Sequence, residues 1–129
     1  MNEILSYYRD SQQVTELNQW LGGKDGNILH LVRMAGSSPA VIAACMVGDP
    51  GKTHVFILPD KESAAYFHND LFNLSGREDI LFFPSSYKRS VQYVQKSSDN
   101  VVLRTGVLKK LSQDAAGQII ITFPEALVE

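Results

Sequence analysis

The fold class follows from one stretch of the sequence, residues 27–44, which reads Asn27-Ile28-Leu29-His30-Leu31-Val32-Arg33-Met34-Ala35-Gly36-Ser37-Ser38-Pro39-Ala40-Val41-Ile42-Ala43-Ala44. Its first part, residues 27–32, predicts a strand, and Gly36 predicts a tight loop after it. Ser38 is expected to cap the next helix, and Pro39 suits a first turn, where a missing N–H costs nothing. That helix, ending near Val47, is almost wholly apolar, so we expect it to be buried.

The rest of the chain repeats the alternation of helices and short β-branched runs. The predicted elements are a helix around residues 14–21, strands at 53–58, 80–83 and 118–122, and helices at 61–74 and from Asp99 to about Leu111. The polar and aromatic segment 85–97 has no clear period and is interpreted as a long loop. Strands separated by helices of this length pair in parallel through crossover connections. The sequence therefore predicts an α/β protein with a mostly parallel sheet and flanking helices.

Length and composition limit the function classes. The chain has 129 residues, enough for a single α/β domain over residues 1–129, and a net charge of -2 gives no global reason to attract DNA or anionic lipid. Its apolar stretches are too short to cross a membrane and no leader pattern opens it, so we expect a soluble cytoplasmic protein. The sequence stops within an apparent helix start at residues 124–129, which we interpret as the N-terminal fragment of a larger multidomain protein.

The sequence contains no clear pattern for a metal site, a disulfide or a catalytic nucleophile. Cys45 is the only cysteine, so it forms no intrachain disulfide, and a packed thiol is the simplest interpretation. His30, His54 and His68 have no metal-ligand spacing, and Ser37 lacks the pattern of a nucleophile elbow. We therefore expect no catalytic residue and no metal site.

Residues 27–44 have the strand, tight loop and helix of a phosphate-binding loop in the same order, but they lack the residues that bind phosphate. Such a loop needs glycines around the phosphates, a lysine for their charge and a hydroxyl for Mg²⁺. Aligning Gly36 with the tight-turn glycine places Arg33 at the first glycine, Pro39 at the lysine and Ala40 at the serine or threonine. Proline offers neither a cation nor an N–H, and alanine cannot bind a metal. The degenerate loop, Gly36-Ser37-Ser38-Pro39-Ala40, is therefore expected to bind no nucleotide cofactor.

One segment is both basic and aromatic. Residues 85–96 read Ser85-Ser86-Tyr87-Lys88-Arg89-Ser90-Val91-Gln92-Tyr93-Val94-Gln95-Lys96. Lysine and arginine contact phosphates and tyrosine stacks on bases or on a protein surface, so partner or nucleic-acid contacts are predicted for Tyr87, Lys88, Arg89, Tyr93 and Lys96. The alternative is a solvated loop whose tyrosines pack against the sheet.

With these motifs in order, the chain resembles the N-terminal end of bacterial transcription-repair coupling factors, whose first module is similar to the excision-repair subunit UvrB. The resemblance runs from about Gln12 to the end. It rests on four markers in sequence order: the loop 35–40, the helix start Pro59-Asp60-Lys61-Glu62-Ser63-Ala64-Ala65, Phe82-Phe83-Pro84 before a long loop, and Ile119-Ile120-Ile121-Thr122-Phe123-Pro124-Glu125-Ala126-Leu127. UvrB-like relatives keep an intact ATP-binding loop, whereas coupling factors lack its lysine, as this chain does. The glycine missing at Arg33 and the less acidic segment 85–88 depart from the family pattern.

The resemblance implies a P-loop NTPase or helicase-like fold, RecA-like and similar to UvrB domain 1a, with a silent nucleotide loop. It implies a non-catalytic scaffold in transcription-coupled nucleotide excision repair, which recruits UvrA to stalled RNA polymerase. UvrA, RNA polymerase and DNA would be bound through other domains, beginning with a UvrA-binding domain after Glu129, and ATP through a separate translocase motor. Two alternatives remain: an ATP-dependent helicase or nucleotide-binding fragment, and a nucleic-acid-binding module that uses the 85–96 segment.

Overall fold

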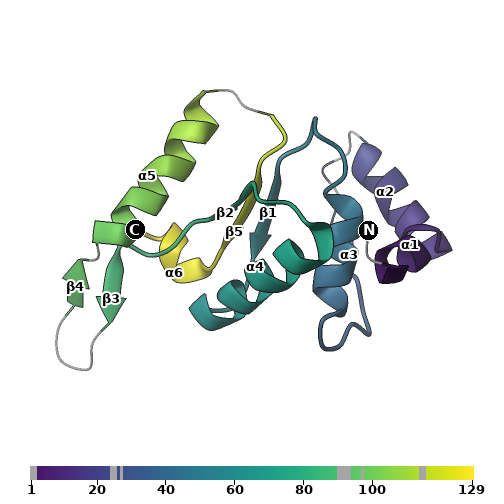
Figure 1. Cartoon of the computed structure of the whole chain (residues 1–129), viewed down its shortest axis with the longest axis horizontal. Helices are drawn as coiled ribbons and strands as arrows, with labels where there is room; N and C mark the ends of the chain where they lie inside the picture. The colour runs from purple at the N-terminus through teal and green to yellow at the C-terminus, as the bar shows by residue number, and fades with distance from the viewer. Residues whose placement is uncertain (1–2, 24–25, 27, 90–93, 97, 114–115) are drawn as a thin grey trace.

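The protein is described by a computed structural model that covers residues 3–23, 26, 28–89, 94–96, 98–113 and 116–129, with only the backbone for 88, 89 and 94–96. Figure 1 shows a central sheet with helices on either side of it, two short helices at the N-terminal end and a small hairpin at the opposite end. No helix in these ranges is long and apolar enough to span a membrane.

The central sheet has three parallel strands in the order β1-β5-β2. They are β1 (His54–Ile57), β2 (Ile80–Phe82) and β5 (Ile119–Thr122), and Ile119 lies level with both His54 and Ile80. All four residues of β5 are buried, as its run of isoleucines requires for a middle strand covered on both faces. The predicted parallel α/β architecture is confirmed at this level.

Four helices build the core on one side of this sheet. The helices α3 (Ser38–Met46) and α4 (Lys61–Ser75) pack on each other, and α1 (Glu3–Arg9) and α2 (Gln12–Gly22) pack on α3 (Figure 1). As predicted, α3 is mostly buried. The core cluster joins side chains from all four helices and the sheet, among them Leu5, Val14, Ala43, Ala44, Ala64, Phe67, Leu71, Ile119, Ile121 and Phe123.

Local sequence fixes the ends of α4. The Asp60 carboxylate accepts a hydrogen bond of 2.7 Å from the Ser63 N–H, which satisfies one donor of the first turn. Gly76 ends the helix with φ +66°, a left-handed conformation that glycine adopts without steric cost. The helix predicted from residues 61–74 is therefore confirmed, and β1 leads directly into it.

The strand predicted at residues 27–32 is wrong for the residues that are described. Residues 28–32 form no strand, and Ile28 and Val32 are 83% and 75% exposed. A strand is stable only when a neighbour pairs with its backbone, and none of the described segments does so here. The apolar sequence is that of a buried strand, but the sheet ends at β1.

The C-terminal half corrects two further expectations. The segment interpreted as a long loop contains an antiparallel pair, β3 (Tyr87–Arg89) and β4 (Val94–Lys96). The helix α5 (Ser98–Ser112) contains Asp99 in its first turn rather than at its cap. The apolar side chains of α5 are mostly exposed: Val107 is buried, whereas Leu103, Leu108 and Leu111 are exposed. The turn α6 (Pro124–Leu127) follows β5 as predicted.

Candidate functional site

The loop at residues 33–40 has two residues in the left-handed backbone conformation that glycine adopts most easily. Arg33 has φ +62° and Gly36 has φ +58°. Left-handed conformations cost most residues about 1–2 kcal/mol, and glycine adopts them freely. Arg33 is the only described residue other than glycine with a positive φ, and it occupies the position aligned with the first glycine of a phosphate loop. The backbone at this position therefore has a conformation that glycine adopts most easily, although the residue is arginine.

The polar groups of the loop bond to one another. The Ala35 N–H donates to the Ser38 hydroxyl at 2.9 Å, and the Ser38 N–H donates to the Ala35 carbonyl at 3.2 Å. Ser38 is thus the first helical residue, and the cap position belongs to Ser37, whose side chain makes no capping bond. The prediction that Ser38 caps α3 was wrong by one residue, because its hydroxyl closes the loop instead. Pro39 lies in the first turn, as predicted.

This arrangement lacks the lysine and the metal-binding hydroxyl of a phosphate loop. The Ser38 N–H is engaged, Pro39 has no N–H, and Ala40 is buried and has no oxygen to offer a metal. Beside the loop lies an apolar groove of about 250 Å³ between the 31–34 segment, α3, β1 and α4, lined by residues that include Leu31, Met34, Ile42, Phe56, Ile57 and Phe67. The groove offers van der Waals contact and no charge.

A second cavity, of about 370 Å³, lies between α2, the end of α3 and the start of β1, and it contains polar side chains. Burial raises the pKa of the Cys45 thiol, although Arg9 opposes the shift, and burial together with the Lys52 charge lowers the pKa of His54. The Lys52 ammonium donates to the Leu21 carbonyl at 2.7 Å. A protonated thiol, a neutral imidazole and an engaged lysine do not form an activated nucleophile.

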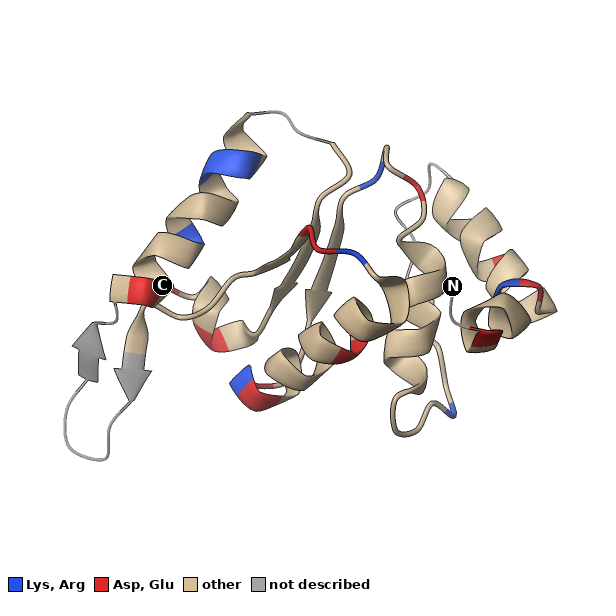
Figure 2. Ribbon diagram, in the orientation of Figure 1, with Lys and Arg blue, Asp and Glu red and all other residues tan. Residues whose placement is uncertain are grey.

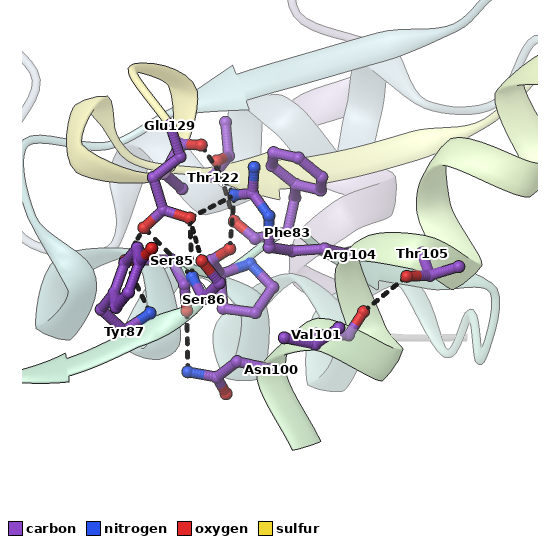
Figure 3. A network of polar contacts seen from close by, with 12 residues as sticks. Phe83, Ser85, Ser86, Tyr87, Asn100, Val101, Arg104, Thr105, Thr122 and Glu129 are labelled. Carbon is purple, nitrogen blue, oxygen red and sulfur yellow. Dashed lines mark hydrogen bonds and ion pairs between the residues drawn. The ribbon is translucent and has the colours of Figure 1, made fainter. Parts of the chain in front are cut away.

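A third group of polar side chains surrounds Glu129 (Figure 3). One carboxylate oxygen, Oε1, accepts from the Ser85 hydroxyl and the other, Oε2, from the Ser86 hydroxyl. The Ser86 N–H lies 3.1 Å from Oε1 and 2.9 Å from Oε2, and the Arg104 guanidinium lies 3.6 Å from Oε2. We name the two donors Ser85 and Ser86, together with the ion-pair partner Arg104, the Ser–Arg cradle.

The cradle holds Glu129 as an anion. Its side chain is only 16% exposed, and burial alone would raise the pKa of Glu129. The hydrogen bonds from Ser85 and Ser86 and the charge of Arg104 outweigh that effect and lower the pKa to about 2. The carboxylate is therefore ionised throughout the physiological range.

Of the residues predicted to contact a partner, Tyr87 is placed, 47% exposed at the start of β3. The side chains of Lys88, Arg89 and Lys96, and all of Tyr93, lie outside the described residues. Elsewhere in the described residues, both acidic and basic positions occur along the ribbon (Figure 2). In the described ranges, no group of three or more His, Cys, Asp or Glu residues could hold a metal.

Sequence reasoning did not find the cradle. Glu129 lies 43 residues after Ser86 in the sequence, and no short motif joins it to the cradle. Comparisons with protein-family models, with curated proteins and with solved structures found no match.

Proposed function

We propose that this domain is a non-catalytic scaffold of the UvrB-like module in a transcription-repair coupling factor, acting in the recruitment of UvrA to stalled RNA polymerase. The observation that carries the proposal is the loop at residues 33–40. It has left-handed backbone at Arg33 and Gly36, two positions aligned with glycines, and it has proline and alanine where a phosphate loop has its lysine and its metal-binding hydroxyl. A loop with the turn of a phosphate loop but without its lysine and hydroxyl is consistent with a structural rather than a nucleotide-binding role.

The open side of the sheet supports a role inside a larger assembly. The edge strand β1 exposes Val55 and Ile57, at 54% and 57%, and the nearby 28–34 segment exposes Ile28 and Val32. Apolar side chains gathered at an edge with unpaired backbone favour contact with another structured segment. We propose that the rest of the UvrB-like module covers this edge, and that this contact lets the domain position the recruiting surface.

Isothermal titration with ATP and Mg²⁺ tests the silent loop. We expect no binding tighter than about 100 μM, which corresponds to about 5.5 kcal/mol, because the remaining helix N-terminus favours an anion by only about 0.3–1 kcal/mol. An intact P-loop ATPase in the same buffer serves as the positive control. Tighter binding by this domain would favour the nucleotide-binding alternative and reject the scaffold interpretation of the loop.

A further inference from the structure

The Ser–Arg cradle is held in place by contacts that do not involve Glu129. The Asn100 amide donates to the Ser85 carbonyl at 2.8 Å. Arg104 donates through Nη1 to the Pro84 carbonyl at 2.9 Å, and its guanidinium lies 4.2 Å from the centre of the Phe83 ring. These bonds connect α5 to the chain that leaves β2, so the donors keep their positions when the carboxylate is absent.

The cradle also has the composition of a site for an anion with two oxygens. It offers two hydroxyl donors, one backbone N–H shared by both oxygens, and one guanidinium whose side chain is 15% exposed. Hydrogen bonds to a charged acceptor are about twice as strong as neutral ones. Removal of Glu129 would therefore leave the Ser85 and Ser86 donors without their anionic acceptor, while Arg104 keeps its hydrogen bonds to the Pro84 carbonyl at 2.9 Å and the Ala126 carbonyl at 2.7 Å.

We propose that the Ser–Arg cradle is a carboxylate-binding site, which Glu129 fills from within the chain and which an acidic side chain of a partner protein fills when Glu129 withdraws. The planar, two-oxygen geometry of the bound Glu129 side chain is the reason for assigning a carboxylate (Figure 3). Glu129 competes from the same chain, at an effective concentration in the millimolar range or above, so it masks the site until it is displaced. This proposal does not depend on the scaffold role.

Titration of the Glu129→Ala variant with acetate tests the site. The readouts are the amide resonance of Ser86 and the guanidinium resonance of Arg104, at constant ionic strength with chloride as the balancing anion. We expect a saturable shift with a Kd of about 10 mM, and a shift at least about tenfold weaker in the parent protein, where Glu129 occupies the cradle. The matched control, Ser85→Ala/Ser86→Ala/Glu129→Ala, should lose the response.

Two results would overturn the assignment. A folded Glu129→Ala variant that gives no saturable shift up to about 100 mM acetate would show that the cradle does not bind a free carboxylate. A saturable response to inorganic phosphate without one to acetate would reject a carboxylate ligand. If Glu129→Ala does not fold, the same titration is made on Glu129→Gln. Acetate should displace the glutamine amide from the cradle, and the absence of a response would count equally against the site.

Discussion

Replacing Phe123 with alanine is expected to lower the free energy of unfolding by about 3–5 kcal/mol. Phe123 is 1% exposed, lies between β5 and α6, and belongs to the core cluster, where its ring centre is 6.3 Å from that of Phe82. The substitution removes the buried ring and leaves a cavity in the layer that joins the sheet to its helices. For a domain whose total stability is of order 5–15 kcal/mol, this is a large fraction.

Urea unfolding followed by circular dichroism measures the effect. Phe72→Ala is the matched control, because Phe72 has the same ring but lies 41% exposed on α4, and we expect a loss of about 1 kcal/mol or less. If Phe123→Ala fails to fold, Phe123→Leu gives a milder version of the same change. Equal losses for Phe123→Ala and Phe72→Ala would contradict the packing described for β5 and α6.

Gly117→Ala is expected to cost about 2–4 kcal/mol. Gly117 has φ +82°, and a Cβ at this position would lie 2.0 Å from the Pro50 carbonyl oxygen. The close approach brings two turns together where the parallel strands begin, since the next residue, Gln118, accepts a 2.8 Å hydrogen bond from the His54 N–H. A side chain must therefore push the β1 and β5 ends apart.

Gly36→Ala separates the conformational cost of a positive φ from the steric cost of the contact with Pro50. Gly36 also has a positive φ, +58°, but an added Cβ would meet no atom within 4 Å. Its cost should be the conformational one alone, about 1–2 kcal/mol. Thermal or urea unfolding of both variants gives the comparison, and a Gly117→Ala variant no less stable than Gly36→Ala would show that the contact with Pro50 is not as close as described.

The elements that the sequence predicts well are those whose own residues specify them. The isoleucine run of β5 and the Asp60 cap of α4 each carry enough local information to specify type and position. Parallel pairing follows from the lengths of the connections between strands. The degenerate chemistry of the loop was also visible in the sequence, since it depends only on which residue types stand at positions 33, 39 and 40.

The features that the sequence did not predict correctly depend instead on tertiary contacts. Residues 28–32 have the composition of a buried strand, but a strand also needs a neighbour, and sequence periodicity does not reveal whether one is present. The β3–β4 pair was missed because its segment shows neither apolar alternation nor a turn dipeptide typical of hairpins. The site around Glu129 depends on residues far apart in the chain, so no local pattern could indicate it.

Under the proposed function, this domain positions the recruiting module through its open sheet edge, and Ile57→Glu in the full-length protein tests that proposal most directly. The isolated domain should change its stability by about 0.5 kcal/mol or less, because Ile57 is 57% exposed in it. Tyr66→Glu, at a position 74% exposed on α4, is the control. We predict that UvrA co-purifies with the Tyr66→Glu protein and is lost with Ile57→Glu, while DNA-stimulated ATPase activity is unchanged in both. Undiminished UvrA co-purification with Ile57→Glu would contradict the account.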